Sequence, residues 1–283
     1  MNLNLHIVEE TASTNADVRR ALEEGAPEGY AVMARMQTGG YGRRGNAWAS
    51  PKGGLYLSLL LRPTRPLADW PTLSLLSALA VLRAVEGAYA PQTGEGARAE
   101  RWGAAADPRA CVDACVDGFL VRVDDPLVRA DGSLARALDL RIKPPNDVIV
   151  GTQTTHPLKL AGILPETHAG GVALGFGVNI KRPREVAVVE GKNTPVYLEE
   201  LLEAQARSVS IADASSAPVA NKRVAGGVFS ESNIASSSSA YQLDVAAFAK
   251  VLLETFEKCY SRWLQNGFEP FEAEYLNYAT DKF

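Results

Sequence analysis

The sequence has few of the residues that build disulfide frameworks or zinc sites. Its 283 residues include three histidines and three cysteines, Cys111, Cys115 and Cys259. Cys111 and Cys115 are four residues apart and can share a helix face, but no nearby histidine or third cysteine completes a zinc set. A disulfide-stapled secreted domain is excluded, and a reduced, cytoplasmic setting is expected.

Long apolar runs and an excess of positive charge are also missing. No stretch approaches the about 20 apolar residues that span a membrane, and residues 1–5 show no charged-then-apolar signal pattern. The formal net charge is −4, whereas dedicated nucleic-acid-binding proteins usually carry a basic excess. We therefore expect neither a membrane nor a nucleic acid as partner.

The hydrophobic content of 46% and the charged content of 22% are typical of a globular protein. We expect a single domain over residues 1–283, with a surface insert at 87–117 and a flexible Ser-rich loop at 208–240. Apolar periodicity and turn signals predict strands at 5–8, 30–37, 55–61, 119–123, 138–142, 147–150, 158–164 and 172–180. They predict helices at 16–24, 72–86, 197–205, 243–265 and 270–278. Strands at hairpin-like spacing with flanking helices indicate an α+β fold with a mostly antiparallel sheet.

One glycine-rich segment has the composition of an anion-binding loop. It reads Gly40-Tyr41-Gly42-Arg43-Arg44-Gly45, with Gln37 before it and Trp48 after it. Glycines let a backbone approach a ligand with its N–H groups exposed, and arginines add forked, charged donors for phosphate or carboxylate. The alternative is a surface hairpin with solvated arginines.

The familiar nucleotide-binding motifs do not fit this loop. A Gly-x-Gly-x-x-Gly fingerprint binds a dinucleotide only between a strand and a helix, and here a second strand, 55–61, follows. The chain contains no Val-Ala-Ile-Lys, His-Arg-Asp or Asp-Phe-Gly of a protein kinase and no phosphate-binding loop of the Gly-x4-Gly-Lys type.

Four further segments place polar groups at the ends of expected elements. Ser13-Thr14-Asn15 opens a helix, where N-capping is the simpler explanation. Lys143-Pro144-Pro145-Asn146-Asp147 is rigid, because its prolines fix the backbone. Lys159 stands in an apolar strand, where alternation would send it to solvent unless an anion pairs with it inside. Gly162, and the alternating Gly175 and Gly177 with Asn179, suggest troughs where a ligand approaches a strand, or simple relief of packing.

These motifs, in this order, resemble the catalytic domain of the biotin protein ligases. The resemblance covers about residues 5–179 and includes Leu-Tyr-Leu-Ser, Lys-Leu-Ala-Gly-Ile-Leu and Gly-Phe-Gly-Val-Asn. It implies a fold like that of class II aminoacyl-tRNA synthetases. It also implies an enzyme that adenylates biotin with ATP and Mg²⁺ and then passes biotin to one lysine of a biotin carrier domain.

The resemblance also implies roles for individual residues. The biotin-binding set would be Ser13, Thr14, Asn15, Gln37, Gly40, Gly42, Arg43, Lys159, Gly162, Leu164 and Gly175. The set for ATP and the adenylate would be Gly40, Tyr41, Arg43, Arg44, Gly45, Trp48, Lys143, Asn146, Asp147, Gly177 and Asn179. Lys159, Arg43 and Asp147 would act in the chemistry, with Asp147 also on the Mg²⁺ side.

The chain departs from the family pattern at several points. Tyr41 stands where the family usually has arginine, Asn46 where a basic residue is common, and Pro144 in place of a tryptophan. We therefore expect weaker loop closure. We expect no winged-helix segment before the first strand, so repressor activity is not implied. We also expect no small β-barrel domain after the last helix, either because this branch of the family lacks it or because the chain has been cut. A homodimer is compatible with the sequence. Transfer of lipoate or octanoate on the same fold and a non-catalytic biotin sensor remain alternatives.

Overall fold

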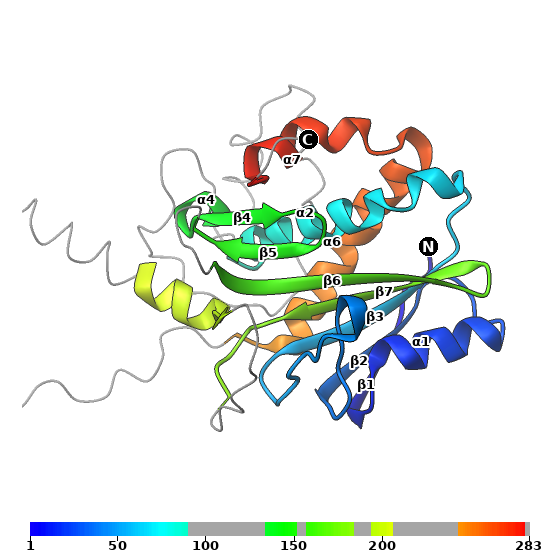
Figure 1. Ribbon diagram of the computed structural model, residues 1–283, viewed down its shortest axis with the longest axis horizontal. Helices are drawn as coiled ribbons and strands as arrows, with labels where there is room; N and C mark the ends of the chain where they lie inside the picture. The colour runs from blue at the N-terminus through cyan, green and yellow to red at the C-terminus, as the bar shows by residue number, and fades with distance from the viewer. Residues whose placement is uncertain (90–133, 152–156, 184–193, 206–242, 281–283) are drawn as a thin grey trace, which may run out of the picture.

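The computed structural model describes residues 1–89, 134–151, 157–183, 194–205 and 243–280 (Figure 1). Cys111, Cys115, the strand predicted at 119–123 and the Ser-rich loop at 208–240 lie outside the described residues, as does most of the insert predicted at 87–117. No helix among the described residues is long and apolar enough to cross a membrane.

The described part of the chain forms one eight-stranded mixed sheet with helices on both sides. The strands are β1 Asn4–Thr11, β2 Tyr30–Gln37, β3 Leu55–Leu61, β4 Leu140–Lys143, β5 Asp147–Val150, β6 Leu158–His168, β7 Gly171–Val178 and β8 Thr194–Pro195. The helices are α1 Thr14–Glu23, α2 Thr72–Tyr89, α4 Leu134–Ala137, a helix over 198–205, α6 Val245–Asn266 and α7 Glu272–Tyr278. Short 3₁₀ turns occupy Arg43–Gly45, Leu67–Asp69 and Glu269–Phe271.

The strand order is β1-β2-β3-β7-β6-β5-β4, with β8 beside β6. Strand β1 pairs parallel to β2, and β8 parallel to β6, whereas the remaining pairs are antiparallel. The predicted α+β class with a mostly antiparallel sheet is confirmed.

The elements predicted within the described residues are present, although several bounds differ; β1, predicted at 5–8, runs from Asn4 to Thr11. Three other differences have identifiable reasons. Strand β6 continues to His168 rather than ending at 164. Beyond Gly162 it no longer pairs with β5, so one of its edges is free. Pro165 is tolerated there, because proline lacks the N–H that an inner strand position needs. Strand β4 begins at Leu140 because the short α4 precedes it. Helix α2 reaches Tyr89, so residues 87–89 belong to a helix and not to the predicted insert.

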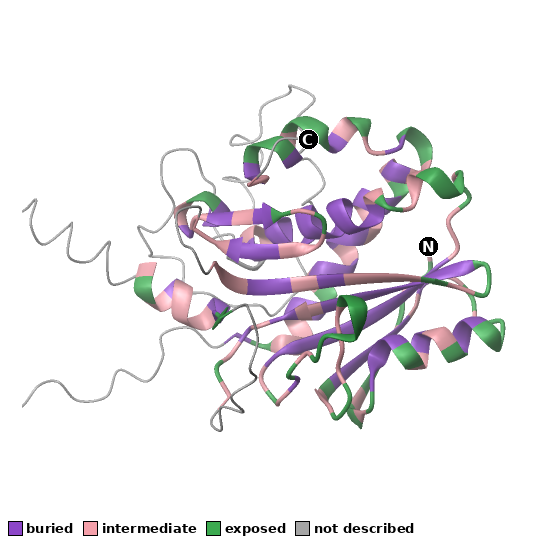
Figure 2. Cartoon of the chain, in the orientation of Figure 1, coloured by how far each residue is buried: buried purple, intermediate pink, exposed green. Residues whose placement is uncertain are grey.

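Alternation along the strands separates the two faces of the sheet. Residues such as Leu57, Leu59 and Phe176 face the main core, which α2 and α6 cover. Their neighbours Leu60 and Ala173 face α1, where Val18 and Leu22 complete a smaller cluster. Figure 2 shows this sheet and the helix sides that face it as the buried part of the molecule. Because side chains in a strand point alternately to opposite faces, Tyr56, Ser58, Gly175 and Gly177 share the α1 face.

Candidate active site

A cleft of about 950 Å³ opens on the α1 face of the sheet. This volume lies within the range of pockets that hold small molecules and nucleotides. Its lining combines the start of α1, the glycine-rich loop and the middles of β3, β6 and β7. Eighteen of the residues predicted for the site meet here. Gly40 packs directly behind the cleft. The other seventeen line it: Ser13, Thr14, Asn15, Gln37, Tyr41, Gly42, Arg43, Arg44, Trp48, Asn146, Asp147, Lys159, Gly162, Leu164, Gly175, Gly177 and Asn179.

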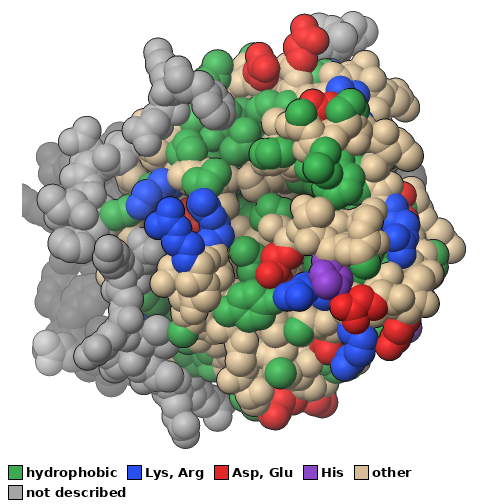
Figure 3. Space-filling model, turned by 45° about the vertical axis from the view of Figure 1, so that its right-hand side comes forward, with side chains coloured by type: hydrophobic (Ala, Val, Ile, Leu, Met, Phe, Trp, Pro, Cys, Tyr) green, Lys and Arg blue, Asp and Glu red, His purple; other side chains and the backbone are tan. Residues whose placement is uncertain are grey.

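Besides Gly40, two residues predicted for the site do not line the cleft. Lys143 is exposed at the end of β4, and Gly45 lies at the exposed tip of the glycine-rich loop. Other lining residues were not predicted, among them Tyr56, Ser58, Lys181 and Tyr197. On the face drawn in Figure 3, basic and acidic side chains are interspersed among apolar ones, so the described residues of this face carry no broad field of one sign.

The glycine-rich loop is a hairpin between β2 and β3, as the sequence predicts. The Gly42 amide donates to the Asn46 carbonyl at 2.8 Å, and the Trp48 amide donates to the Gly40 carbonyl at 2.9 Å. Arg44 turns the tip with a left-handed φ of 58°. A Cβ at Gly40 would lie 2.4 Å from Ser50 Oγ, so this position requires glycine for packing. The hairpin carries Tyr41 and Arg43 over the cleft.

A chain of uncharged polar groups forms one end of the cleft. The Thr14 amide and hydroxyl both donate to Gln37 Oε1, at 2.9 and 3.1 Å. Ser58 Oγ lies 2.8 Å from Thr14 Oγ1 and 2.7 Å from Asn15 Oδ1. Ser13, Thr14, Asn15 and Ser58 are all buried. Ser58 was missed as a site residue, although it ends the Leu-Tyr-Leu-Ser motif.

The capping explanation applies to one residue of the Ser13-Thr14-Asn15 segment. Ser13 is the N-cap of α1, and its Oγ accepts from the Ala16 amide at 3.5 Å, at the long limit of a hydrogen bond. Thr14 and Asn15 instead use their side chains within the cleft. Capping therefore explains Ser13, and the polar chain explains its two neighbours.

Charged groups form the other end of the cleft. Lys159 Nζ lies 2.7 Å from Asp147 Oδ1, and both side chains are 14% exposed. Arg43 Nη1 donates to Asn146 Oδ1 at 3.3 Å, while Asn146 Nδ2 donates to the Ile163 carbonyl. This places two cations and one carboxylate at the edge where β5 and β6 meet the hairpin.

A β-bulge turns Lys159 into the cleft. In the β5–β6 pairing, Val148 is opposite Ala161 and Ile149 opposite Lys159, so Leu160 is an extra residue without a partner. Leu160 and Ala161 are both buried in the main core, and the alternation restarts with Lys159 on the α1 face. Asn179 stabilises this bulge with two hydrogen bonds. Its side-chain Nδ2 donates to the Lys159 carbonyl, and its backbone N–H donates to the Leu160 carbonyl.

Side chains of the site itself occupy the glycine troughs. A Cβ at Gly175 would lie 2.5 Å from Asn15 Oδ1, and a Cβ at Gly177 would lie 2.8 Å from the Trp48 ring. Lys159 Nζ lies 5.1 Å from the centroid of that ring, in cation–π range. The buried Trp48 Nε1 has no hydrogen-bond partner among the described residues. The glycines thus admit the side chains of Asn15 and Trp48 against the sheet.

Tyrosines line the cleft in protonated form. Burial first, and then the hydrogen bond to Glu166, raise the pKa of Tyr41. Burial raises the pKa of Tyr197 and of Tyr56, whose hydroxyl donates to the Pro51 carbonyl at 2.7 Å. All three are therefore donors at neutral pH.

The part of the chain that the structure describes holds no group of three or more His, Cys, Asp or Glu side chains arranged for a metal ion. Asp147 is the carboxylate that lines the cleft beside Lys159. One carboxylate suits Mg²⁺, which proteins commonly hold through one or two carboxylates together with substrate phosphates.

Comparison with known proteins agrees with this geometry. Residues 8–181 match the model of the biotin/lipoate A/B protein ligase family. The bifunctional ligase/repressor BirA of Bacillus spizizenii is 42% identical over 83 residues, which are 29% of this chain and 26% of that protein. The biotin–[acetyl-CoA-carboxylase] ligase of Paracoccus denitrificans is 30% identical over 190 residues, 65% of this chain and 58% of that protein.

A solved structure extends the similarity to the fold. The biotin protein ligase of Leishmania major in complex with biotinyl-5-AMP superposes with a TM-score of 0.58 at 20% identity, covering 100% of this chain and 85% of that one. The chain thus spans 26% and 58% of the lengths of the two curated relatives.

Proposed function

The chain belongs to the biotin/lipoate A/B protein ligase family, and we propose that it is an ATP-dependent biotin protein ligase. In the first step, a biotin carboxylate oxygen attacks the α-phosphorus of ATP, and pyrophosphate leaves as biotinyl-5′-AMP forms. In the second step, a lysine amine of a biotin carrier domain attacks the acyl carbon, loses a proton and releases AMP.

The observation that carries this proposal is the division of the cleft into an uncharged and a cationic end. Thr14, Gln37 and Ser58 present amide and hydroxyl groups at one end, whereas Lys159 and Arg43 lie at the other. Biotin has the same polarity, with a neutral bicyclic urea at one end and a carboxylate at the other. The fatty chain of lipoate or octanoate offers no partner for the polar chain.

The cationic end also meets the main energetic requirement of the first step. A carboxylate and a phosphate about 4 Å apart repel by about 4 kcal/mol at an effective dielectric constant of about 20. Lys159 and Arg43 would offset this repulsion and stabilise the charge that develops in the transition state. Asp147, already paired with Lys159, would hold Mg²⁺ together with phosphate oxygens, and the ion would supply further neutralising charge.

The second step needs a proton acceptor near the incoming lysine. Asp147 is a carboxylate at the cationic end of the cleft. We propose that it accepts this proton or orients the attacking amine. The name of the Paracoccus denitrificans relative, a biotin–[acetyl-CoA-carboxylase] ligase, supports a carboxylase carrier domain as the protein substrate.

The proposal is tested by incubating the protein with biotin, MgATP and a carrier domain. Mass spectrometry is expected to find one biotin-sized addition on a single lysine, with pyrophosphate released in parallel. Lipoate in place of biotin is the comparison. Tighter calorimetric binding and transfer of lipoate would overturn the biotin assignment, whereas biotin binding without pyrophosphate release would identify a non-catalytic sensor.

A further inference from the structure

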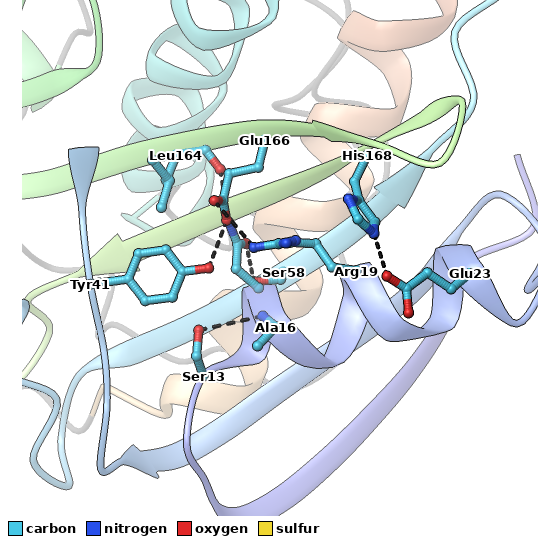
Figure 4. A network of polar contacts seen from close by, with 10 residues as sticks. Ser13, Ala16, Arg19, Glu23, Tyr41, Ser58, Leu164, Glu166 and His168 are labelled. Atoms are coloured by element: carbon cyan, nitrogen blue, oxygen red, sulfur yellow. Dashed lines mark hydrogen bonds and ion pairs between the residues drawn. The ribbon is translucent and has the colours of Figure 1, made fainter. Parts of the chain in front are cut away.

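One carboxylate, Glu166, gathers donors from two separate segments of the site (Figure 4). Its Oε2 accepts from Tyr41 Oη at 2.8 Å and from Asn15 Nδ2 at 2.7 Å. Its Oε1 lies 3.8 Å from Arg19 Nη1, a longer ion pair. The glycine-rich loop and the first turn of α1 are therefore tied to the same oxygen on β6.

The position of Glu166 follows from the alternation of β6. Gly162, Leu164 and Glu166 are two residues apart and share the α1 face, with Leu164 opposite Gly175. Gly162 and Leu164 line the cleft, whereas Glu166 lies one step further along, beyond the lining. Its side chain is 25% exposed, so its hydrogen bonds are only partly screened by water. Glu166 is placed to hold cleft residues without contacting a ligand itself.

The hairpin needs such a tether. Residues 43–47 of the hairpin are exposed, and its internal hydrogen bonds fix its shape but not its position over the cleft. Two hydrogen bonds hold it over the cleft: Tyr41 donates to Glu166 on β6 at 2.8 Å, and Arg43 donates to Asn146, just before β5, at 3.3 Å. The first is the shorter and involves an ionised acceptor, so it is the stronger of the two.

We infer that Glu166 is a positioning residue that anchors the glycine-rich loop over the cleft through Tyr41 and orients Asn15 through the same oxygen. Tyr41, where the family usually has arginine, keeps the loop closed by a hydrogen bond instead of leaving it loose. This tether would counteract the weaker loop closure that the sequence leads us to expect. The part of this inference that concerns the adenylate depends on the proposed function, and the part that concerns the loop does not.

Trypsin tests the anchor without any substrate. Arg43 and Arg44 lie at the exposed tip, and cleavage after them requires the hairpin to open. Tyr41→Phe removes only the hydroxyl, and we expect it to speed cleavage at these two residues of the ligand-free protein by about fivefold or more. Tyr30→Phe is the matched control, because Tyr30, at the start of β2, packs against the His6 ring outside the lining of the cleft.

Variants of Glu166 separate the anchor from a general loosening of the fold. Glu166→Ala removes the acceptor, and we expect it to speed cleavage at least as much as Tyr41→Phe. The double variant should match Glu166→Ala alone, because the hydroxyl acts through this carboxylate. Glu166→Gln keeps an acceptor oxygen and should fall between the wild type and Glu166→Ala. Equal cleavage in wild type and Tyr41→Phe, or additive effects in the double variant, would overturn the anchor.

The role in the reaction is tested by the lifetime of the bound adenylate. Tyr41→Phe should release biotinyl-5′-AMP about threefold faster or more, whereas Tyr30→Phe, outside the cleft, should form and release it at the wild-type rates. Unchanged release, or loss of adenylate formation, would overturn the positioning role. If the wild type forms no adenylate, the proposed function fails while the trypsin result still decides the anchor.

Discussion

Lys159 Nζ and Asp147 Oδ1 lie 2.7 Å apart across two neighbouring strands, and the two side chains are equally shielded from water. The pair exists because the bulge at Leu160 returns Lys159 to the face on which Asp147 lies. A partly buried carboxylate and ammonium stabilise each other, and the same ammonium is available to an anion that enters the cleft. The pair therefore holds the lysine ready before substrate arrives.

Replacing Lys159 with alanine is expected to slow adenylate formation by at least about tenfold, a loss of about 1.4 kcal/mol of transition-state stabilisation. The reason is that the change removes the cation proposed to face the biotin carboxylate and the α-phosphate. Pyrophosphate release measures the rate. Lys52→Ala is the control, since Lys52 is exposed and pairs with Glu9 outside the cleft. Unchanged turnover of Lys159→Ala would remove this lysine from the site.

Replacing Arg43 with glycine is expected to give an enzyme that still forms the adenylate but loses it to solution. Arg43 contacts Asn146, and in the proposed reaction its charge would face the adenylate phosphate. Labelling of unrelated proteins by escaped biotinyl-5′-AMP measures the leak, which should rise about tenfold if one charged hydrogen bond is lost.

Arg44→Gly is the matched comparison for this leak. Arg44 is the adjacent cation, and its left-handed φ of 58° suits glycine, so this change removes charge with little backbone cost. The assignment of Arg43 predicts a larger leak from Arg43→Gly. Equal leaks from both variants would mean that loop charge in general, rather than Arg43, retains the adenylate.

Replacing Ser58 with alanine is expected to weaken biotin binding by about tenfold, because Asn15 Oδ1 and Thr14 Oγ1 lose a buried partner at a cost of about 1–2 kcal/mol. Calorimetry gives the dissociation constant. Ser77→Ala is the control, since Ser77 is equally buried but donates to the Leu73 carbonyl within α2. It should lower the melting temperature similarly without changing the affinity for biotin. Equal affinity losses in both variants would contradict a local role.

Replacing Glu274 with alanine is expected to lower the free energy of unfolding by about 2–4 kcal/mol, because it breaks a buried ion pair. Glu274 binds Arg83, whose side chain is 3% exposed and also donates to Cys259 Sγ at 3.1 Å. This contact joins α7 to α2 and α6. Urea denaturation measures the loss, and Glu272→Ala, at an exposed position of the same helix, should change stability by less than about 0.5 kcal/mol. Equal losses would contradict the role of the ion pair.

Local patterns predicted much of the fold. The strands at 30–37, 55–61 and 147–150 have the predicted bounds, because each is an apolar run closed by glycine, proline or polar residues. Such patterns could not predict to which face of the sheet the Lys159 side chain points. Strict alternation sends it away from the site, and only the pairing of β5 with β6 reveals the extra residue Leu160.

The same reason explains which site residues the sequence missed. Ser58 and Glu166 have no striking local motif, and each gains its role from partners 43 to 151 positions away in the chain. The motifs themselves located the cleft correctly, since Arg43, Lys159 and Asn179 do line one cavity. Lys143 failed to join them because the turn at Pro144 and Pro145 leaves its side chain in solvent.

The two faces of β3 and β7 have different tasks, since one packs in the core and the other lines the cleft. Leu57, Leu59 and Phe176 pack in the main core on one face of these strands, while Ser58 and Gly175 line the cleft on the other. Ligand preference can therefore drift, or be redesigned, one residue at a time along a strand whose alternate positions keep the protein folded.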